Sequence, residues 1–475
     1  MELSGDETSD AAAQLTRKNN RRKKKSTEAG LSRPGLNARQ CAQRLLSAIV
    51  DARTPMDALT DDAHGHPTYL ALERRDRSLV RAILMAALRY RGDLEAFIDR
   101  FVERPLPEGA HSLRAILHVA SAQILFLDVP AHSAVDLAVE CANRDPRNRR
   151  FAALINAITR RMVREKGSLL SAVQRGQNNA PSWFFDRMVE VYGIKAAENI
   201  TAMHRHPAPT DITLRTGDID VANRLMAAAK GKKLDATSVR LVGKLNVTDL
   251  PGFDDGSWWV QDYAASIPAK LFGDLKNKRV LDLCAAPGGK TAQLLAMGAS
   301  VTALEKSANR AKRLRENLAR TNLSETCEVI VEDLFKFQSS VPYDAVLLDA
   351  PCSSTGTVRR HPDVPWTKTP DDIAKLASLQ ARMLQKAKDF VGPGGLLVFS
   401  NCSLDPLEGE EVARAFQKEN DGAFDSEVMD VSEDVVTSDM ITEEGWVRTT
   451  PDHMVDDEPL MAGMDGFFAA RFRRR

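Results

Sequence analysis

Two cysteines in the last third of the chain each follow a short apolar run and could act as nucleophiles. Cys352 ends the string AVLLDAPC, and Cys402 ends the string GLLVFSNC. Short apolar runs bounded by Gly or Pro are typical of buried parallel strands. In a doubly wound sheet, ligands bind at the carboxyl ends of such strands. We therefore expect both thiols to face one crevice, with Asp349 beside them, where a thiolate could attack an electrophilic ring carbon.

A glycine-containing turn upstream is typical of a cofactor site. The string LDLCAAPGGKT, residues 281–291, indicates a strand, a turn and the start of a helix. Glycines let backbone approach a ligand, and a helix N-terminus favours polar or anionic groups. A triphosphate-binding loop would need glycine where Cys284 stands, and the dinucleotide fingerprint Gly-x-Gly-x-x-Gly is absent. The candidate cofactor-binding residues of this turn are Cys284, Ala285, Ala286, Pro287, Gly288, Gly289 and Lys290.

Carboxylates follow three of the predicted strands. Glu305 closes the strand after the turn, at the distance where nucleoside-binding folds place a ribose-binding acid. Asp333 ends the next predicted strand, where it could reach an adenine amino group, and Asp349 follows a third. Each acid alone could cap a helix, but three together are unusual as packing because buried acids need partners. The set indicates S-adenosylmethionine, with Glu305, Asp333 and Asp349 as cofactor-binding candidates.

Composition sets the class of protein but says little about partners. The chain has 475 residues, 43% hydrophobic and 27% charged, as expected for two or three globular domains. Lysine plus arginine equals aspartate plus glutamate at 65 each, so net charge indicates no partner. No run is long and apolar enough to cross a membrane, and the polar, then basic N-terminus has no signal core. We expect a cytoplasmic protein that does not bind membranes and acts as a monomer.

The six cysteines lack the paired spacing of a metal site or a disulfide framework. We therefore expect no metal ion. Outside the motifs, Cys41, Cys141 and Cys327 are expected to be small core residues.

Changes of pattern along the chain predict four regions. The first lacks hydrophobic periodicity and carries the basic run 17–25, which could bind nucleic acid or simply be solvated. The second has apolar residues at helical spacing throughout, with arginines on its outer faces. A polar linker at 167–181 leads into a mixed segment, after which strands and helices alternate. The expected boundaries are a disordered basic tail at 1–34, a helical domain at 35–170, a linker and small α+β subdomain at 171–262, and an α/β domain at 263–475.

Within the α/β domain the sequence predicts a parallel sheet with an antiparallel last strand. In the mixed segment a helix is expected at 183–204 and strands near 212–215 and 238–242. The predicted strands of the large sheet are 279–283, 300–304, 328–331, 344–348, 396–399 and 467–472.

These motifs closely resemble the RNA cytosine-5 methyltransferases of the Sun/NOL-NOP family, in family order from about residue 255 to 475. The matching strings are QDYAAS from 261, LDLCAAPGGKT from 281, DAPCSSTG from 349, RRHPD from 359, GGLLVFSNCS from 394 and GMDGFF from 463. The helical region resembles the NusB-like RNA-binding domain through LFLDVPAHSAVDLAVE, 125–140, and LINAITR, 154–160. The combination is similar to the bacterial 16S ribosomal RNA branch of the family.

The resemblance implies a fold, a cofactor and a reaction. The fold would be a Rossmann-like, S-adenosylmethionine-dependent methyltransferase domain with a mixed seven-stranded sheet. An all-helical NusB-like domain and a small α+β linker domain would precede it. Cys402 would attack carbon 6 of a cytosine in RNA, and carbon 5 of that ring would take the methyl group. The resemblance to the ribosomal branch implies 16S ribosomal RNA as the substrate. Asp349 would hydrogen-bond ring nitrogen 3. Cys352 would assist removal of the carbon 5 proton and release of the enzyme.

Two features of the motifs need structural explanation. Asn401 stands before the proposed nucleophile where the family usually has threonine, and since asparagine can donate and accept hydrogen bonds, we expect the loop to survive. Arg359, Arg360 and His361 follow Cys352 and are interpreted as a phosphate clamp, the alternative being a solvated loop.

Two other function classes remain open from sequence. One is a noncatalytic RNA-binding assembly factor that keeps the cofactor fold as a scaffold, which the intact Cys352, Cys402 and Asp349 argue against. The other is a DNA cytosine methyltransferase. That class takes its nucleophile from the Pro-Cys loop, here Cys352, whereas the helical domain favours RNA.

Overall fold

The computed structural model describes residues 33–175, 179–243, 245–427 and 435–475. The predicted basic tail therefore lies outside the described residues, apart from its last two. The chain forms two compact units. The helical unit comprises the residues up to Ala48 together with Asp57–Ala87 and Phe97–Leu170, and the second unit comprises Ile49–Met56, Leu88–Ala96 and Ser171–Arg475. Two short stretches inside the predicted helical domain thus group with the second unit.

Helices alone make up the regular structure of the helical unit within the described residues. The most buried is α7, His111–Phe126, whose residues from Leu113 to Leu125 are buried with one exception. A helix that is apolar on nearly all sides is expected at the centre of such a unit. No helix in the described part of the chain is long and apolar enough to cross a membrane. The other helices are α2 (Leu36–Val50), α3 (Met56–Leu59), α4 (Pro67–Leu70), α5 (Arg74–Arg89), α6 (Arg91–Phe101), α8 (Ala131–Arg144), η1 (Arg149–Phe151) and α9 (Ala152–Arg175).

The polar linker predicted at 167–181 is wrong over its first half. Helix α9 continues to Arg175. Leu169 and Val173 are buried, with 1% and 7% of their surface exposed, and their spacing of four extends the apolar stripe of the helix. Gly167 is tolerated inside the helix because packing of that stripe outweighs its low helix propensity.

A small antiparallel sheet follows in the second unit. The predicted single helix at 183–204 is two helices, α10 (Ser182–Tyr192) and α11 (Ile194–Met203), because Gly193 adopts a left-handed φ of 79° between them. The sheet has the order β2-β3-β1-β4. Its elements are β1 (Thr210–Leu214), α12 (Ile219–Ala228), β2 (Gly231–Lys233), β3 (Ser238–Leu241), η2 (Val247–Asp249) and β4 (Trp258–Val260).

A buried ion pair joins this small sheet to the C-terminal segment. Arg240 donates to both carboxylate oxygens of Asp211 at 2.7 Å, and both side chains are essentially fully buried. The same guanidinium donates to the backbone carbonyls of Met461 and Gly463 at 2.8 and 2.6 Å. Because every donor has a buried acceptor, the pair fixes the two segments together.

The large sheet is mixed, as predicted, with five parallel strands and an antiparallel end. Its order is β10-β12-β9-β8-β5-β6-β7, and β11 pairs with β12 off this path. The seven strands that the resemblance implies are therefore one fewer than observed. The six strands predicted from the residues lack β10 and β11, because three-residue strands are too brief to show alternation in the sequence. The strands are β5 (Arg279–Leu283), β6 (Ser300–Leu304), β7 (Cys327–Ile330), β8 (Tyr343–Asp349), β9 (Val391–Asn401), β10 (Phe424–Ser426), β11 (Val447–Thr449) and β12 (Phe467–Arg474).

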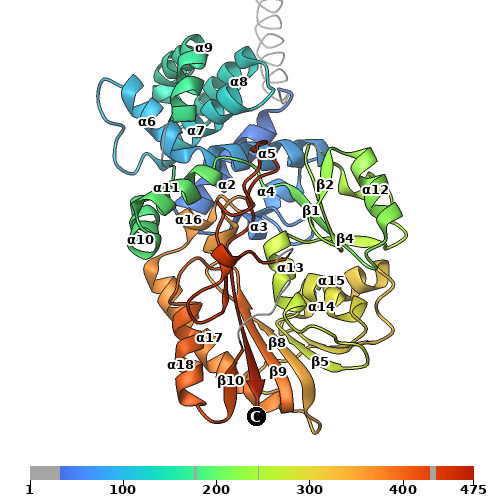
Figure 1. The fold of residues 1–475 in the computed structure, drawn as a ribbon. Helices are drawn as coiled ribbons and strands as arrows, with labels where there is room; N and C mark the ends of the chain where they lie inside the picture. Colours follow the sequence, from blue (N-terminus) through green and yellow to red (C-terminus); the bar gives the residue numbers. More distant parts are fainter. Residues whose placement is uncertain (1–32, 176–178, 244, 428–434) are drawn as a thin grey trace, which may run out of the picture. The chain divides into compact units, whose positions relative to one another are not determined.

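Strand order locates the crevice. The chain proceeds outward through β5, β6 and β7, then returns to the other side of β5 with β8, and β9 follows next to β8 (Figure 1). The topological switch point thus lies between β5 and β8, and ligands bind outside the carboxyl ends of strands at such a point.

Helices cover both faces of this sheet, which explains why its strands are continuously apolar. Val280, Leu347 and Val398 face one core together with residues of the helices that precede and follow β5. Leu281, Val346 and Phe399 face the other core, with residues from 383 to 416. The covering helices are α13 (Tyr263–Lys270), α14 (Gly289–Ala296) and α15 (Ala308–Arg320) on the first face and α17 (Pro370–Ala387), η4 (Lys388–Phe390) and α18 (Glu410–Glu419) on the second. Three short helices complete the unit, η3 (Thr355–Thr357), α16 (Val364–Thr367) and η5 (Ser438–Met440).

Candidate active site

One cavity of about 750 Å³ opens at the carboxyl ends of the parallel strands. It brings together most of the residues singled out from sequence, at both of the predicted sites. Of those residues, the cavity is lined by Cys284, Ala286, Glu305, Asp333, Asp349, Cys352 and Cys402. Ala285, Pro287, Gly288, Gly289 and Lys290 of the turn do not line it. The expectation that both thiols face one crevice is confirmed.

The two thiols are neighbours because their strands are neighbours. Strands β8 and β9 pair in parallel with Asp349 opposite Ser400, so the loops after them start at the same level. The sulfur atoms of Cys352 and Cys402 lie 3.4 Å apart. The hydroxyl of Ser354, a residue in the left-handed conformation with φ 60°, lies 3.5 Å from the Cys402 sulfur.

Their surroundings make the two thiols unequal. The hydrogen bond with Cys402 raises the pKa of Cys352, and burial and the nearby Glu408 carboxylate act in the same direction. Hydrogen bonding with Cys352 and with Ser354 lowers the pKa of Cys402 against the opposing effect of its burial. Since only the thiolate form is nucleophilic, shifts in opposite directions favour one reactive sulfur and one proton-bearing sulfur in the pair.

Asp349 is held between the thiols and the glycine turn. Ser400 donates to one carboxylate oxygen at 3.0 Å, and Lys290 donates to the other at 2.7 Å. The Lys290 ammonium also lies 4.7 Å from the centre of the Phe467 ring. Lys290, although absent from the cavity wall, therefore acts on the site by orienting this carboxylate.

The turn after β5 has a backbone that its sequence explains. Cys284 has φ 64°, and Gly288 has φ 106°. A Cβ atom on Gly288 would lie 2.5 Å from the Leu314 side chain, so only glycine fits. Beneath the turn, Thr291 donates to the buried Asp282 at 2.6 Å, and burial raises the pKa of Asp282 to about 7. Sequence reasoning missed Asp282, although an acid inside an apolar strand is a visible signal.

Glu305 has one carboxylate oxygen that is ion-paired but accepts no hydrogen bond among the described residues. Its side chain is 3% exposed, and one oxygen accepts from the Ser307 backbone N–H at 2.9 Å. The other oxygen has no hydrogen-bond donor among the described residues, although Arg310 lies 3.2 Å away as an ion pair. A buried carboxylate oxygen without a donor fits the hydroxyl groups of a ribose.

Asp333 lies three residues beyond β7, not at its end as predicted. Lys306 lies 2.8 Å from its carboxylate, and the hydrogen bond from Lys306 lowers the pKa of Asp333. Sequence reasoning missed the apolar part of the wall beside it. Phe335 is 44% exposed there, which is unusual for a large aromatic side chain, and its neighbours in the wall are Leu334, Ala350, Pro351, Leu379 and Met383. Such a surface suits a flat heteroaromatic ring.

The phosphate clamp predicted at Arg359 and Arg360 is wrong. Arg359 is 1% exposed and donates to the Ala462 carbonyl at 3.0 Å. Arg360 forms ion pairs with Asp262 and Asp465. Both arginines hold backbone and carboxylates inside the fold, because the C-terminal segment folds back over them in a way that sequence spacing does not reveal.

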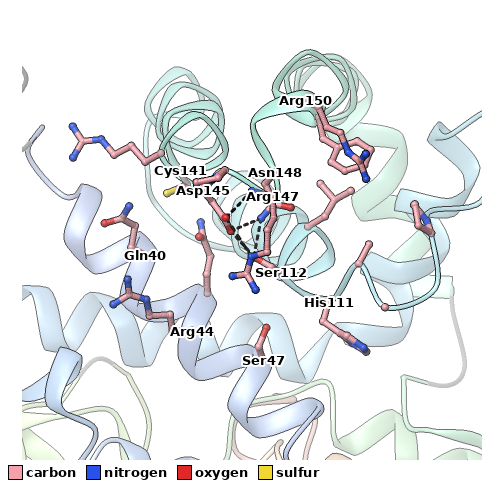
Figure 2. Close-up of a pocket in the computed structure, with 18 of the residues that line it drawn as sticks. Gln40, Arg44, Ser47, His111, Ser112, Cys141, Asp145, Arg147, Asn148 and Arg150 are labelled. Carbon is pink, nitrogen blue, oxygen red and sulfur yellow. Dashed lines mark hydrogen bonds and ion pairs between the residues drawn. The ribbon is translucent and has the colours of Figure 1, made fainter.

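The helical unit contains a second cavity, of about 780 Å³, that differs in character (Figure 2). Four arginines line it against two carboxylates, and all four are exposed; they are Arg44, Arg144, Arg147 and Arg150. A local network lies at its centre, where Asn148 donates to Ser112 at 2.7 Å and to Asp145 at 2.8 Å. The wall also includes the first turn of α7, whose N-cap residue Ala110 offers no side-chain cap. Exposed guanidiniums and a helix N-terminus together favour anions.

Comparisons with known proteins agree with both units. The family described as 16S rRNA methyltransferase RsmB/F matches residues 271–473, and the NusB family matches residues 36–164. Ribosomal RNA small subunit methyltransferase B of Pseudomonas putida is 30% identical over 92% of this chain and 98% of its own length. The protein of the same name from Xanthomonas campestris is 36% identical over 80% of this chain and 88% of its own length.

A solved structure shares the fold. The crystal structure of PH0851 superposes with a TM-score of 0.66 and 22% identity, covering 94% of this chain and all of that one. The RsmB/F match at residues 271–473 includes every residue that lines the cavity of about 750 Å³. The NusB match at residues 36–164 covers most of the helical unit. The chain therefore belongs to the RsmB/F family of 16S rRNA methyltransferases and is an S-adenosylmethionine-dependent enzyme.

Proposed function

We propose that this enzyme methylates carbon 5 of a cytosine in 16S ribosomal RNA, through a covalent bond between Cys402 and carbon 6. The observation that carries the proposal is the single cavity at the switch point. It holds acids suited to an adenosyl group and, beside Asp349, two thiols whose sulfurs are 3.4 Å apart. This arrangement supports the proposal because it would let a nucleophile and a methyl donor act on one substrate ring.

The cofactor would be bound by residues from three strands. Glu305 offers its ion-paired oxygen to the ribose hydroxyls, and Asp333 accepts from the adenine amino group beside Phe335. The turn from Cys284 to Lys290 supplies backbone near the amino-acid end, and Asp349 closes the site toward the substrate. Bound there, S-adenosylmethionine supplies an electrophilic methyl group.

Cys402 carries out the attack. Its thiolate forms a bond to carbon 6 of the cytosine, and the electron pair of the 5,6 double bond moves so that carbon 5 becomes nucleophilic. Asp349, held by Lys290 and Ser400, accepts a hydrogen bond from the protonated ring nitrogen 3 and stabilises the charge that develops there. Carbon 5 then takes the methyl group. Because the ring must leave its stack, unpaired RNA is the favoured substrate.

Cys352 completes the reaction by removing the proton from carbon 5. Before attack, the negative charge of Cys402 keeps the proton on Cys352. Once Cys402 has become a thioether that charge is gone, so the pKa of Cys352 falls and the thiol can release its proton to solvent water. The resulting thiolate accepts the carbon 5 proton, the double bond reforms, and the bond between carbon 6 and the Cys402 sulfur breaks.

The helical unit would hold the RNA. Its cavity presents Arg44, Arg147 and Arg150 (Figure 2), and Arg144 also lines it. These side chains can contact backbone phosphates without reading sequence. The match of this unit to the NusB family supports the proposed RNA-binding role.

Mapping of methylcytosine in ribosomal RNA tests the proposal. Cells lacking the gene should lose a methylcytosine from 16S RNA, and the purified enzyme with S-adenosylmethionine should restore it. Unchanged methylation in the deletion strain, together with full cellular function of a Cys402→Ala variant, would instead support a noncatalytic assembly factor.

A further inference from the structure

A fully buried carboxylate on the loop that carries Cys402 hydrogen-bonds the residue that follows each of the two thiols. Glu408, 0% exposed, precedes helix α18. One of its oxygens accepts from the Ser353 backbone N–H and from the Gln380 side chain, each at 2.9 Å. The other accepts from the Ser403 hydroxyl at 2.6 Å and from the Ser353 hydroxyl. Four donors from three segments thus converge on one carboxylate.

These donors are the residues next to the reactive cysteines. Ser353 directly follows Cys352, and Ser403 directly follows Cys402. The two serine hydroxyls also lie 3.2 Å from each other. The position of one thiol loop relative to the other is therefore set through the Glu408 side chain.

Asn401 extends the same network and explains why asparagine is compatible with this loop. Its side-chain amide donates to the Glu408 backbone carbonyl at 2.7 Å and to the Gln380 side chain at 3.2 Å. Its carbonyl oxygen accepts from the Ser403 backbone N–H at 3.0 Å. Gln380 in turn donates to the Pro351 carbonyl at 3.1 Å. The residues on both sides of each cysteine are thus tied to one cluster.

We propose that Glu408 is a positioning residue for the methyl transfer: its carboxylate fixes the separation of Cys352 and Cys402, so that attack and release act on one bound ring. The inference rests on the function proposed above. A carboxylate suits this role because only it supplies several acceptor sites and no donor, matching two hydroxyls, an amide and a backbone N–H. A glutamine side chain in its place would direct its own N–H donors at groups that are themselves hydrogen-bond donors.

The test compares Glu408→Gln with Glu411→Gln, a change of the same charge at an exposed position on the same helix start. We expect kcat of Glu408→Gln to fall about 100-fold, since a displacement of about 1 Å at reacting groups costs that much. The KM for RNA and the Kd for S-adenosylmethionine should stay at wild-type values, because Glu408 does not line the cavity. A kcat within twofold of wild type would overturn the inference.

Two serine variants make the test independent of the folding of Glu408→Gln. Ser403→Ala should slow formation of the covalent RNA adduct, and Ser353→Ala should slow its release, both measured on denaturing gels. Equal changes in both steps for both variants, or no change in either, would contradict the positioning role. If wild-type enzyme itself forms no methylcytosine, the proposed function fails, whereas active wild type with unaffected variants refutes only the role of Glu408.

Discussion

The thiol-lined cavity of the second unit and the arginine-lined cavity of the helical unit have similar volumes, but their polar groups differ in burial. In the first, the groups beneath the thiols are buried and hydrogen-bonded, as for Glu408 with its four donors. In the second, the charged groups are exposed, and the Arg147 side chain is 81% exposed. Covalent chemistry needs atoms held in place, whereas holding a polyanion needs charge within reach. The difference predicts steep effects of single changes in the first cavity and shallow, salt-dependent effects in the second.

The largest effect should come from Cys402→Ala. Methyl transfer should fall about 10⁴-fold or more, because the variant lacks the thiol assigned to form the bond to carbon 6. The measurement is incorporation of labelled methyl groups into RNA, together with denaturing gels that should show no covalent adduct. Cys327→Ala, which removes a thiol outside the cavity, is the control and should keep its activity. An adduct formed by Cys402→Ala would reverse the assignment of the two thiols.

Cys352→Ala should separate attack from release. The attacking thiol remains, so a covalent protein–RNA adduct should accumulate as a shifted band, while turnover falls about 100-fold to 1,000-fold for loss of a proton-transfer group. A variant that turns over normally and leaves no adduct would contradict the role of Cys352 in proton removal.

Glu305→Gln should weaken cofactor binding without changing adduct chemistry. Loss of a charged acceptor for the ribose should cost about 2 kcal/mol, or about 30-fold in Kd for S-adenosylmethionine, measured by calorimetry. Glu328→Gln, at an exposed position of β7, should bind as wild type does. Equal affinities of Glu305→Gln and wild type would remove Glu305 from the cofactor site.

The smallest effect should come from the helical cavity. Arg44→Ala combined with Arg147→Ala should weaken RNA binding about tenfold and reduce the slope of log K against log salt by about 2, one per lost phosphate contact. At saturating RNA, kcat should be unchanged. The control is Arg75→Ala with Arg104→Ala, which removes the same charge from exposed positions outside the cavity. If the control pair weakens RNA binding equally, binding depends on the overall positive charge of the helical unit and not on this cavity.

Much of this architecture is predictable from sequence, and the failures share a cause. The strands at 279–283 and 300–304 were predicted to the residue, because continuous apolar runs between turns have few alternative structures. The arginines at 359 and 360 were misassigned, since their partners lie about a hundred or more residues away: Arg360 pairs with Asp262 and Asp465, and Arg359 donates to the Ala462 carbonyl. Phe335 was overlooked because the cavity wall around it arises only when strands and loops assemble, whereas Asp282 is marked in the sequence as an acid inside an apolar strand.

Sequence alone determined the chemistry available to this protein: two thiols after two strands, a glycine turn, and acids at the ends of neighbouring strands. Those features are local, so residue type and spacing are enough to reveal them. Only the tertiary structure decided that the two thiols form one pair, because the 3.4 Å contact between the Cys352 and Cys402 sulfurs depends on the parallel pairing of two strands and on the loops that follow them. It also decided that Glu408 joins their loops, because burial of a carboxylate with four donors requires segments distant in sequence to converge.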